Sequence, residues 1–277
     1  MGKNILHRAH RFDLNHLIIE ILQSKFVGFH FFFQLGSFLG ILLLAFLVVL
    51  VMCAFVDLEK EQQKDNAFYR AVIYMIADAA HTVLRVRVHS QGLEKIPTDG
   101  RVLLVCNHLH EIDPAVLLRA FPKSRLAFIS KREVDNMFLV GKFLHKMLGQ
   151  PIIRENDREA LKTIVKCIQI LRDDKASVAV FPEGYIHPDR KLHHFRSGVF
   201  KIAQKAEVPI VVCTLKNTLN AIPNLLHHRH SNIEASVLEV IYPEEFMELH
   251  TTDIAQRVYE IMAADLGPEN VSQEENA

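Results

Sequence analysis

The sequence is poor in cysteine and has no excess of either charge. Its four cysteines lie far apart, and no two of them form a Cys-x-x-Cys pair. In a chain of 277 residues, this spacing favours free thiols in a reducing compartment over a disulfide framework or a zinc site. The 32 basic residues are matched by 32 acidic ones, so the basic excess of a nucleic-acid-binding surface is missing. We therefore expect no nucleic-acid partner.

One long segment lacks charge altogether. Leu35–Val56 contains no Asp, Glu, Lys or Arg, and as a helix it would span roughly 33 Å, enough to cross a hydrocarbon core of about 30 Å. Because the apolar character extends back to Phe26, residues 26–56 are predicted to form a transmembrane or membrane-embedded helix. A cleaved signal peptide is the alternative, but the run is too long and starts too late for one.

Different structures are expected on the two sides of this helix. Residues 1–25 are predicted to form an amphipathic segment, and residues 57–84 an interfacial helix. The second segment contains Arg70, Asp78 and His81, whose polarity disfavours another full span. A helix lying in the membrane interface or packed on the domain that follows fits better. Basic residues near the apolar run are equally numerous on both sides, so the positive-inside rule does not set its orientation.

The rest of the chain alternates between two kinds of segment. The expected strands are Leu84–Val88, Val102–Cys106, Arg125–Ile129, Ser177–Phe181, Ile210–Leu215 and Ala235–Ile241. The expected amphipathic helices are Arg158–Asp173, Gly198–Ala206 and Thr252–Leu266. This alternation predicts an α/β domain over residues 85–266. The polar residues 267–277 are predicted to be a disordered tail.

A histidine and an aspartate follow one of these strands. The strand that ends at Cys106 runs into Asn107 and His108, and Asp113 precedes Pro114 where a helix is expected to begin. A carboxylate that holds one imidazole nitrogen fixes the tautomer and stabilises the imidazolium. The other nitrogen can then take a proton from a hydroxyl group. Asp before Pro is also a good helix N-cap, so the pair alone leaves a purely structural role open.

Three further segments are weak signals when taken singly. Phe181–Gly184 (Phe-Pro-Glu-Gly) follows an apolar strand, where a Pro-x-Gly turn is common. Arg154 and Arg158 lie on one helix face, where two guanidinium groups suit a phosphate. Pairing with the neighbouring glutamates on a solvated face is the alternative. Val208–Ile210 (Val-Pro-Ile) begins another apolar strand.

In this order the segments resemble the four blocks of the glycerolipid acyltransferase family, whose best-known members are the 1-acylglycerol-3-phosphate acyltransferases. The matching blocks are Asn107-His108-x4-Asp113, Ile152–Arg158, Phe181–Gly184 and Val208–Ile210. Two smaller matches are Lys131–Glu133 and Phe195–Gly198. The resemblance covers residues 88–266 and implies the family's fold, a mixed sheet flanked by helices, here behind an N-terminal membrane helix.

The resemblance also implies direct acyl transfer to the hydroxyl of a lysophospholipid, above all of 1-acylglycerol 3-phosphate (lysophosphatidate), giving phosphatidate. His108 is expected to act as the general base and Asp113 to orient it. The implied substrate-binding residues are Asn107, Lys131, Arg154, Arg158, Glu183 and Gly184. The acyl donor is expected to be a thioester of coenzyme A or of acyl carrier protein. No metal or other cofactor is expected, and His227–His230 is interpreted as a flexible loop.

Several positions depart from the family's pattern and leave the acceptor open. They are His110, Ile153, Tyr185-Ile186 and Asn217. Another lysophospholipid or glycerol 3-phosphate is the alternative acceptor, and a non-catalytic membrane lipid-binding protein is the alternative function. Such a protein has no need of His108 and Asp113. Acyl thioesters are made in the cytosol and the cysteines are unpaired, so the catalytic domain is expected to face the cytoplasm from the membrane.

Overall fold

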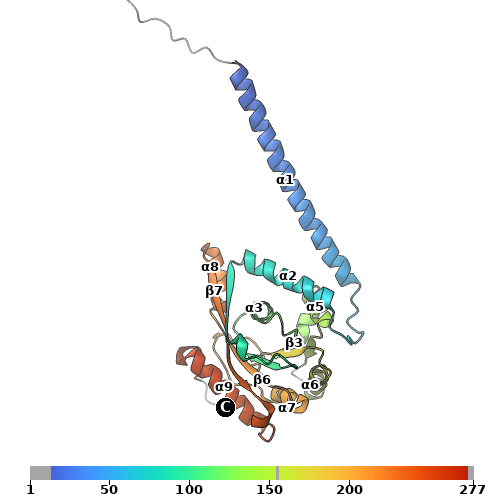
Figure 1. The fold of residues 1–277 in the computed structure, drawn as a ribbon, viewed down its shortest axis with the longest axis vertical. Helices are drawn as coiled ribbons and strands as arrows, with labels where there is room; N and C mark the ends of the chain where they lie inside the picture. The colour runs from blue at the N-terminus through green and yellow to red at the C-terminus, as the bar shows by residue number, and fades with distance from the viewer. Residues whose placement is uncertain (1–13, 154–155, 274–277) are drawn as a thin grey trace, which may run out of the picture. The chain divides into compact units, whose positions relative to one another are not determined.

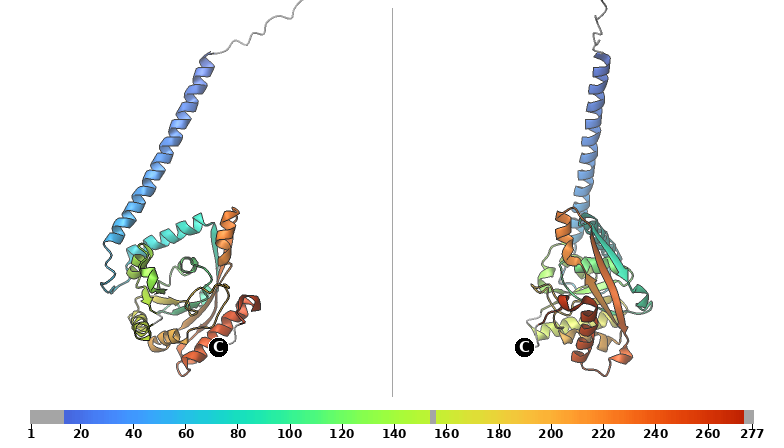
Figure 2. Two further views of the ribbon diagram at one scale, coloured as in Figure 1. Left: turned by 180° about the vertical axis from the view of Figure 1, so that it is seen from behind. Right: turned by 90° about the vertical axis from the view of Figure 1, so that its left-hand side faces the viewer.

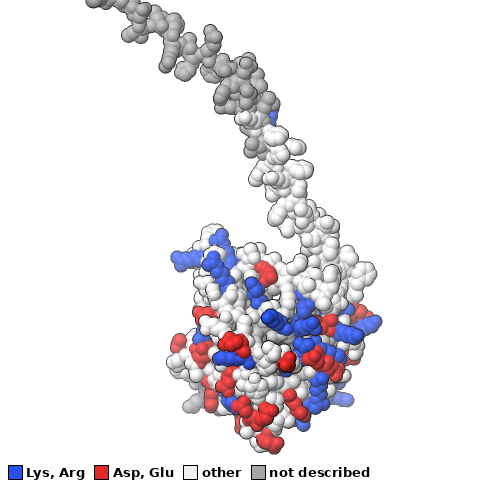
Figure 3. Space-filling view, in the orientation of Figure 1, with Lys and Arg blue, Asp and Glu red and all other residues white. Residues whose placement is uncertain are grey.

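The computed structural model describes residues 14–153 and 156–273, within two compact units, Met1–Phe55 and Val56–Ala277. The described part of the first unit is one continuous helix, α1 (Leu14–Ala54). Its segment Phe29–Ala54 is long and apolar enough to cross a membrane. Figure 3 draws this stretch almost entirely without charged side chains. The prediction for residues 1–25 falls partly on residues 1–13, which lie outside the described part of the chain.

The second unit is built on one sheet, whose seven strands within the described residues run in the order β1-β7-β6-β2-β5-β3-β4. The strands are β1 (Val86–Gln91), β2 (Leu103–Cys106), β3 (Leu126–Lys131), β4 (Gln150–Ile152), β5 (Ser177–Val180), β6 (Ile210–Lys216) and β7 (Ser231–Ile241). Neighbours pair in parallel except β6 and β7. The sheet is therefore mixed, as expected, with β1 and β7 reversed relative to the other five strands.

Helices cover both faces of this sheet (Figures 1 and 2). They are α2 (Ala67–Val83), α3 (Asp113–Ala120), α4 (Arg132–Asp135), α5 (Val140–Lys146), α6 (Asp157–Arg172), α7 (Lys201–Ala206), α8 (Ala221–Leu226) and α9 (Thr251–Leu266). Successive strand side chains point to opposite faces. Leu103 and Val105 of β2 join a core with α6, α7 and α9. Leu104 and Cys106 join a second core with α3.

Helix α2 packs on the domain. Its N-cap Asn66 accepts hydrogen bonds from the backbone N–H groups of the first turn. Arg70 is 6 % exposed, forms an ion pair with Asp65 at 2.8 Å, and donates to the Leu126 carbonyl at 3.1 Å. The buried guanidinium thus ties α2 to β3. This helix still presents apolar side chains to the outside, with Phe68, Met75 and Val83 more than half exposed.

The sequence predicted the long elements and missed the short ones. All six expected strands are present, with ends shifted by a few residues. Strand β4 and helices α4, α5 and α8 were not predicted, because each is too short to show a periodic pattern. The residues His227–His230 form an exposed turn between α8 and β7.

The prediction of a disordered tail was wrong for its described part. Pro268–Asn270 forms a 3-10 turn, and the Ser272 N–H donates to the Leu192 carbonyl at 2.9 Å. Val271 packs against the core beside α9. Backbone hydrogen bonds to Leu192 and the packing of Val271 together anchor this segment, and composition alone does not reveal these contacts.

Candidate active site

The residues of the first and third blocks meet at the carboxyl ends of two neighbouring strands. Strands β2 and β5 pair in parallel, so His108 after β2 and Glu183 after β5 lie at the same edge of the sheet. Asn107 joins this edge to β6. Its amide donates to the Leu215 carbonyl at 3.0 Å and accepts from the Leu215 N–H at 2.7 Å. Asn107 is fully buried, so these bonds assign it the positioning of His108.

His108 and Asp113 form the pair that the sequence predicted. The His108 Nδ1 and Asp113 Oδ2 atoms are 2.9 Å apart. The same Oδ2 atom accepts the backbone N–H groups of Leu109 at 2.7 Å and His110 at 2.8 Å. An oxygen that already accepts two N–H groups acts as an acceptor toward the ring. The proton therefore belongs on Nδ1, and the lone pair of Nε2 is left for a substrate.

The two side chains of this pair differ in burial. The Asp113 side chain is 0 % exposed and the His108 side chain is 18 % exposed. Phe181 stacks on the His108 ring, with centroids 4.1 Å apart and planes inclined by 17°. The His108 ring is thus positioned by the buried Asp113 carboxylate at its Nδ1 edge and by the Phe181 ring stacked on its face. In the described part of the chain no side chain bonds to Nε2, which suits a general base.

Glu183 links the catalytic segment to the loop that follows β5. Its Oε1 accepts the His108 N–H at 2.8 Å, and its Oε2 accepts the His193 N–H at 3.1 Å. The side chain is nearly fully buried. Burial raises the pKa of Glu183 to about 8, although the two backbone donors act in the opposite direction. Glu183 therefore shapes the site by fixing the backbone of His108.

The loop after β5 contributes contacts that the sequence analysis missed. Arg190 donates from Nη1 to the Leu109 carbonyl at 2.7 Å, beside the catalytic histidine. The Gly184 backbone has a φ of 91°, a left-handed value that favours glycine. Nothing in the residue pattern singles out Arg190. The stacking of Phe181 could have been anticipated from its place in the third block.

The structure describes two of the three residues that were predicted to bind the phosphate. Lys131 ends β3, the strand next to β5, and its exposed Nζ is 3.0 Å from Glu133 Oε1. Arg158 is exposed in the first turn of α6, where Asn156 caps the helix. Arg154 lies outside the described residues. Among the described contacts none joins Lys131 or Arg158 to His108, so their expected role stays a prediction.

The cysteines near the site are not suited to nucleophilic catalysis. Cys106 precedes the catalytic block and is fully buried, and burial raises its pKa well above the ordinary value of a thiol. Burial likewise raises the pKa of Cys167 to about 12. A buried, protonated thiol is a poor nucleophile, so neither cysteine is suited to covalent catalysis.

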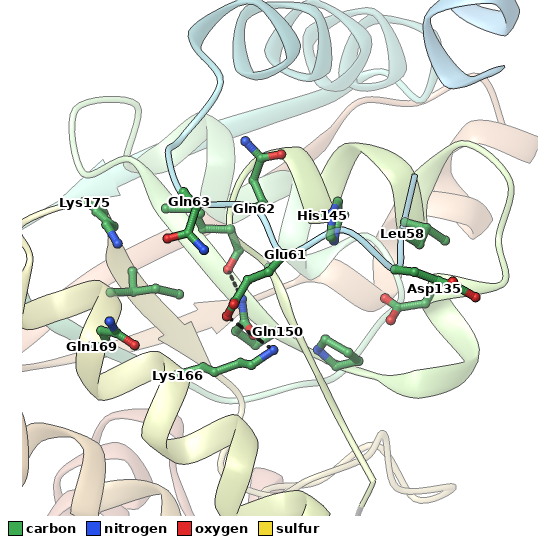
Figure 4. A pocket seen from close by; sticks show the side chains of 15 residues that line it. Leu58, Glu61, Gln62, Gln63, Asp135, His145, Gln150, Lys166, Gln169 and Lys175 are labelled. Atoms are coloured by element: carbon green, nitrogen blue, oxygen red, sulfur yellow. Dashed lines mark hydrogen bonds and ion pairs between the residues drawn. The ribbon is translucent and has the colours of Figure 1, made fainter. Parts of the chain in front are cut away.

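A separate cavity lies next to β4, the strand at one edge of the sheet. It has a volume of about 200 Å³ and is lined by residues of the 58–63 segment, β4 and α6. Figure 4 shows Glu61 and Lys166 facing each other across it, 3.6 Å apart. No residue of the first or third block lines this cavity. The cavity is therefore separate from the His108–Asp113 pair.

Comparisons with known proteins show similarity to acyltransferases. Residues 87–216, which include His108, Asp113 and Glu183, match the family model described as Acyltransferase. A Mycoplasma pneumoniae protein described as a probable 1-acyl-sn-glycerol-3-phosphate acyltransferase is 28% identical over 68% of this chain and 74% of its own. A chloroplastic 1-acyl-sn-glycerol-3-phosphate acyltransferase of Arabidopsis thaliana is 30% identical over 57% of this chain and 47% of its own.

A solved structure shares the fold. The 1-acyl-sn-glycerophosphate acyltransferase PlsC of Thermotoga maritima aligns with a TM-score of 0.60 at 23% identity, over 74% of this chain and 81% of its own. Residues 87–216 are thus similar in sequence to acyltransferases, and the chain shares the fold of one of them.

Proposed function

We propose that this protein transfers a fatty acyl group from an acyl thioester to the free hydroxyl of 1-acylglycerol 3-phosphate, giving phosphatidate. The observation that carries the proposal is the His108–Asp113 pair at the carboxyl end of β2, with Nδ1 bound to a buried carboxylate at 2.9 Å. The printed names of the relatives from Mycoplasma pneumoniae and Arabidopsis thaliana support the choice of acceptor.

The reaction needs one proton carrier. The oxygen of the acceptor hydroxyl forms a bond to the thioester carbonyl carbon. At the same time His108 Nε2 takes the proton of that hydroxyl. The carbon–sulfur bond then breaks, and the imidazolium returns the proton to the leaving thiolate. Asp113 stabilises the imidazolium between these steps. Coenzyme A and acyl carrier protein both supply the same thioester group, so this chemistry is common to both donors.

The acceptor phosphate is proposed to bind to basic residues of the second block and its neighbours. Lys131 supports this role because it ends a strand beside β5. Arg158 supports it through its place in the exposed first turn of α6, where the helix dipole also favours an anion. Arg154 is included on the resemblance of the second block alone.

A panel of acceptors tests the proposed reaction. Purified protein in lipid nanodiscs is given one labelled long-chain acyl-CoA with lysophosphatidate, glycerol 3-phosphate, lysophosphatidylcholine or monoacylglycerol. We expect the fastest transfer to lysophosphatidate, with phosphatidate as the labelled product. Faster transfer to another acceptor would replace lysophosphatidate as the substrate. No transfer to any acceptor from acyl-CoA or acyl-carrier-protein donors would leave a lipid-binding protein as the better account.

We also propose that the domain works on the cytoplasmic face of a membrane, with α2 at the interface. The exposed apolar side chains of α2, Phe68, Met75 and Val83, support a contact with lipid. A pocket that opens to the interface spares the enzyme the cost of extracting an acyl chain from the bilayer. The apolar segment Phe29–Ala54 provides a candidate anchor.

The absence of tryptophan from the sequence makes this contact measurable. A single tryptophan is introduced at Met75 on α2, or at Val165 on α6 as the matched exposed control. In vesicles that contain brominated lipids, we expect strong quenching for Met75→Trp and weak quenching for Val165→Trp. Equal quenching at the two positions would contradict the interfacial role of α2. Labelling of an engineered cysteine near the C-terminus from each side of sealed vesicles then tests the cytoplasmic orientation.

A further inference from the structure

Three side chains beside the active site bring metal-binding atoms together. His187, Asp189 and His193 each offer one donor atom, and these atoms lie within 4.8 Å of one another. The His193 Nε2 atom is 2.9 Å from Asp189 Oδ1 and 3.0 Å from Oδ2. Two ligands of a tetrahedral zinc ion with bonds of about 2.0 Å are themselves about 3.3 Å apart. The donor atoms of His193 and Asp189 therefore already lie within this separation, and the donor atom of His187 lies within 4.8 Å of both.

The local chain holds these groups at one point of the loop. The Arg190 N–H donates to the His187 carbonyl at 3.0 Å and closes a turn, which places His187 and Asp189 together. The His187 and His193 rings are stacked, with centroids 3.5 Å apart and planes inclined by only 3°. A metal ion binds in the plane of an imidazole ring, so one of these two parallel rings has to turn for both to bind the same ion.

We propose that His187, Asp189 and His193 bind one divalent transition-metal ion of the zinc type. Two imidazole nitrogens and a carboxylate oxygen form a donor set that suits this class of ion. His193 is buried and fixed through its backbone, whereas Asp189 is exposed and His187 is half-buried on the turn. The buried ligand thus fixes the position of the site, and the two outer ligands can close on the ion. Water completes the coordination.

The ion would order the segment that supports the catalytic histidine. The His193 N–H donates to Glu183, and Glu183 accepts the His108 N–H. Arg190, between two of the ligands, donates to the Leu109 carbonyl. Fixing the loop at His187, Asp189 and His193 therefore reinforces both connections to the catalytic segment. The role is structural, because the ligand atoms of these three residues are not the atoms that face the substrate in the proposed reaction.

Metal binding to the full chain tests this site without any assay of acyl transfer. The purified protein is freed of metals with a chelator, and Zn²⁺ is titrated against a chromogenic competitor. We expect one ion per chain, with an affinity that falls at least about tenfold in His187→Ala and in Asp189→Asn. Both substitutions are at the outer ligands of the turn, which limits their effect on folding. Hydrogen exchange of residues 184–196 should slow when Zn²⁺ is added to the wild type.

Two histidine variants serve as controls. His194 is next to the site but stacks on Tyr259 instead, and His228 belongs to the exposed turn after α8. His194→Ala and His228→Ala should bind Zn²⁺ as the wild type does. Loss of binding in His228→Ala, or equal affinity in wild type, His187→Ala and Asp189→Asn, would show adventitious binding elsewhere and overturn the proposal. Binding without slower exchange in residues 184–196 would overturn the ordering role.

Discussion

Two histidine–aspartate pairs flank Glu183, and they are built in opposite ways. In both pairs a ring nitrogen lies 2.9 Å from a carboxylate oxygen. In the first pair the Asp113 side chain is 0 % exposed and His108 is 18 % exposed. In the second pair His193 is 10 % exposed and Asp189 is 42 % exposed. The two pairs therefore share one contact distance and differ in the burial of the carboxylate.

The pairs also use different ring nitrogens. Asp113 contacts Nδ1 of His108, so the free nitrogen is Nε2 at the far edge of the ring. Asp189 contacts Nε2 of His193, and the backbone of His193 is tied to Glu183. Only in the first pair is one ring nitrogen bound to a buried carboxylate while Nε2 is left for a substrate. We therefore expect substitutions in the first pair to affect catalysis, and those in the second pair to affect metal binding.

The largest expected effect comes from His108→Ala. Removal of the only proposed proton carrier should lower kcat by roughly 10³-fold or more. The side chain is partly exposed, so thermal unfolding should change little. Steady-state acyl transfer in nanodiscs measures the loss, and His194→Ala provides a control of equal chemistry. Turnover of His108→Ala near that of the control would contradict the role of His108.

A smaller loss is expected for Asp113→Asn, and almost none for Asp189→Asn. The amide keeps the shape of the carboxylate but cannot stabilise the imidazolium, so kcat should fall by roughly 10²- to 10³-fold. Asp189→Asn should change kcat by less than about threefold, because Asp189 does not contact His108. Comparable losses in the two variants would remove the distinction drawn between the pairs.

Glu183→Gln should reduce stability and disturb His108 together. One carboxyl oxygen is replaced by an amide nitrogen that cannot accept the backbone N–H it faces, which costs about 1–3 kcal/mol when the group is buried. Chemical denaturation in the same detergent measures the change in the free energy of unfolding. Glu133→Gln, at a side chain that is 65 % exposed, is the matched control and should be nearly neutral.

The free energy of unfolding should depend on pH through the ionisation of Glu183. Its pKa is about 8 in the folded protein, against an ordinary value of 4.5. The folded state therefore keeps a proton that the unfolded state releases between these values, so the Glu183 contribution falls as pH rises from about 4.5 to 8. The Tm difference between wild type and Glu183→Gln should thus shrink from pH 5 to pH 8.5. A difference that grows with pH would be evidence against this assignment.

Modest effects are expected for the exposed basic residues. Lys131→Ala and Arg158→Ala should raise the KM for lysophosphatidate by less than about tenfold, because exposed ion contacts contribute little. The KM for monoacylglycerol, which has no phosphate, should not change. Initial rates at varied acceptor concentration provide the measurement. An equal rise for both acceptors would exclude a role in phosphate binding.

The contact between His108 and Asp113 could be predicted from the sequence because both residues lie at the junction of a strand and a helix. The apolar alternation of β2 and the helix-initiating Asp113-Pro114 step are local features. Their hydrogen bond then follows from a short connection. The long amphipathic helices α6 and α9 were predictable for the same reason.

Contacts between distant segments could not be read from the sequence. The bonds of Glu183 to His108 and to His193 depend on the adjacency of β2 and β5, which no local pattern encodes. Asn107 was expected to bind substrate, but its partner Leu215 lies on β6. The spacing His187-x-Asp189 and the later His193 were visible in the sequence. Only the fold shows that the three side chains converge.

The tautomer of His108 tests the central claim most directly. Histidine ¹⁵N chemical shifts of the labelled protein in nanodiscs are recorded, and the His108 and His193 signals are assigned by the spectra of His108→Ala and His193→Gln. The account predicts that neutral His108 carries its proton on Nδ1, and that this preference is lost in Asp113→Asn. It predicts the opposite tautomer, with the proton on Nε2, for neutral His193 in the metal-free protein. A proton on Nε2 of neutral His108 would leave no basic nitrogen toward the substrate and would contradict the proposed mechanism.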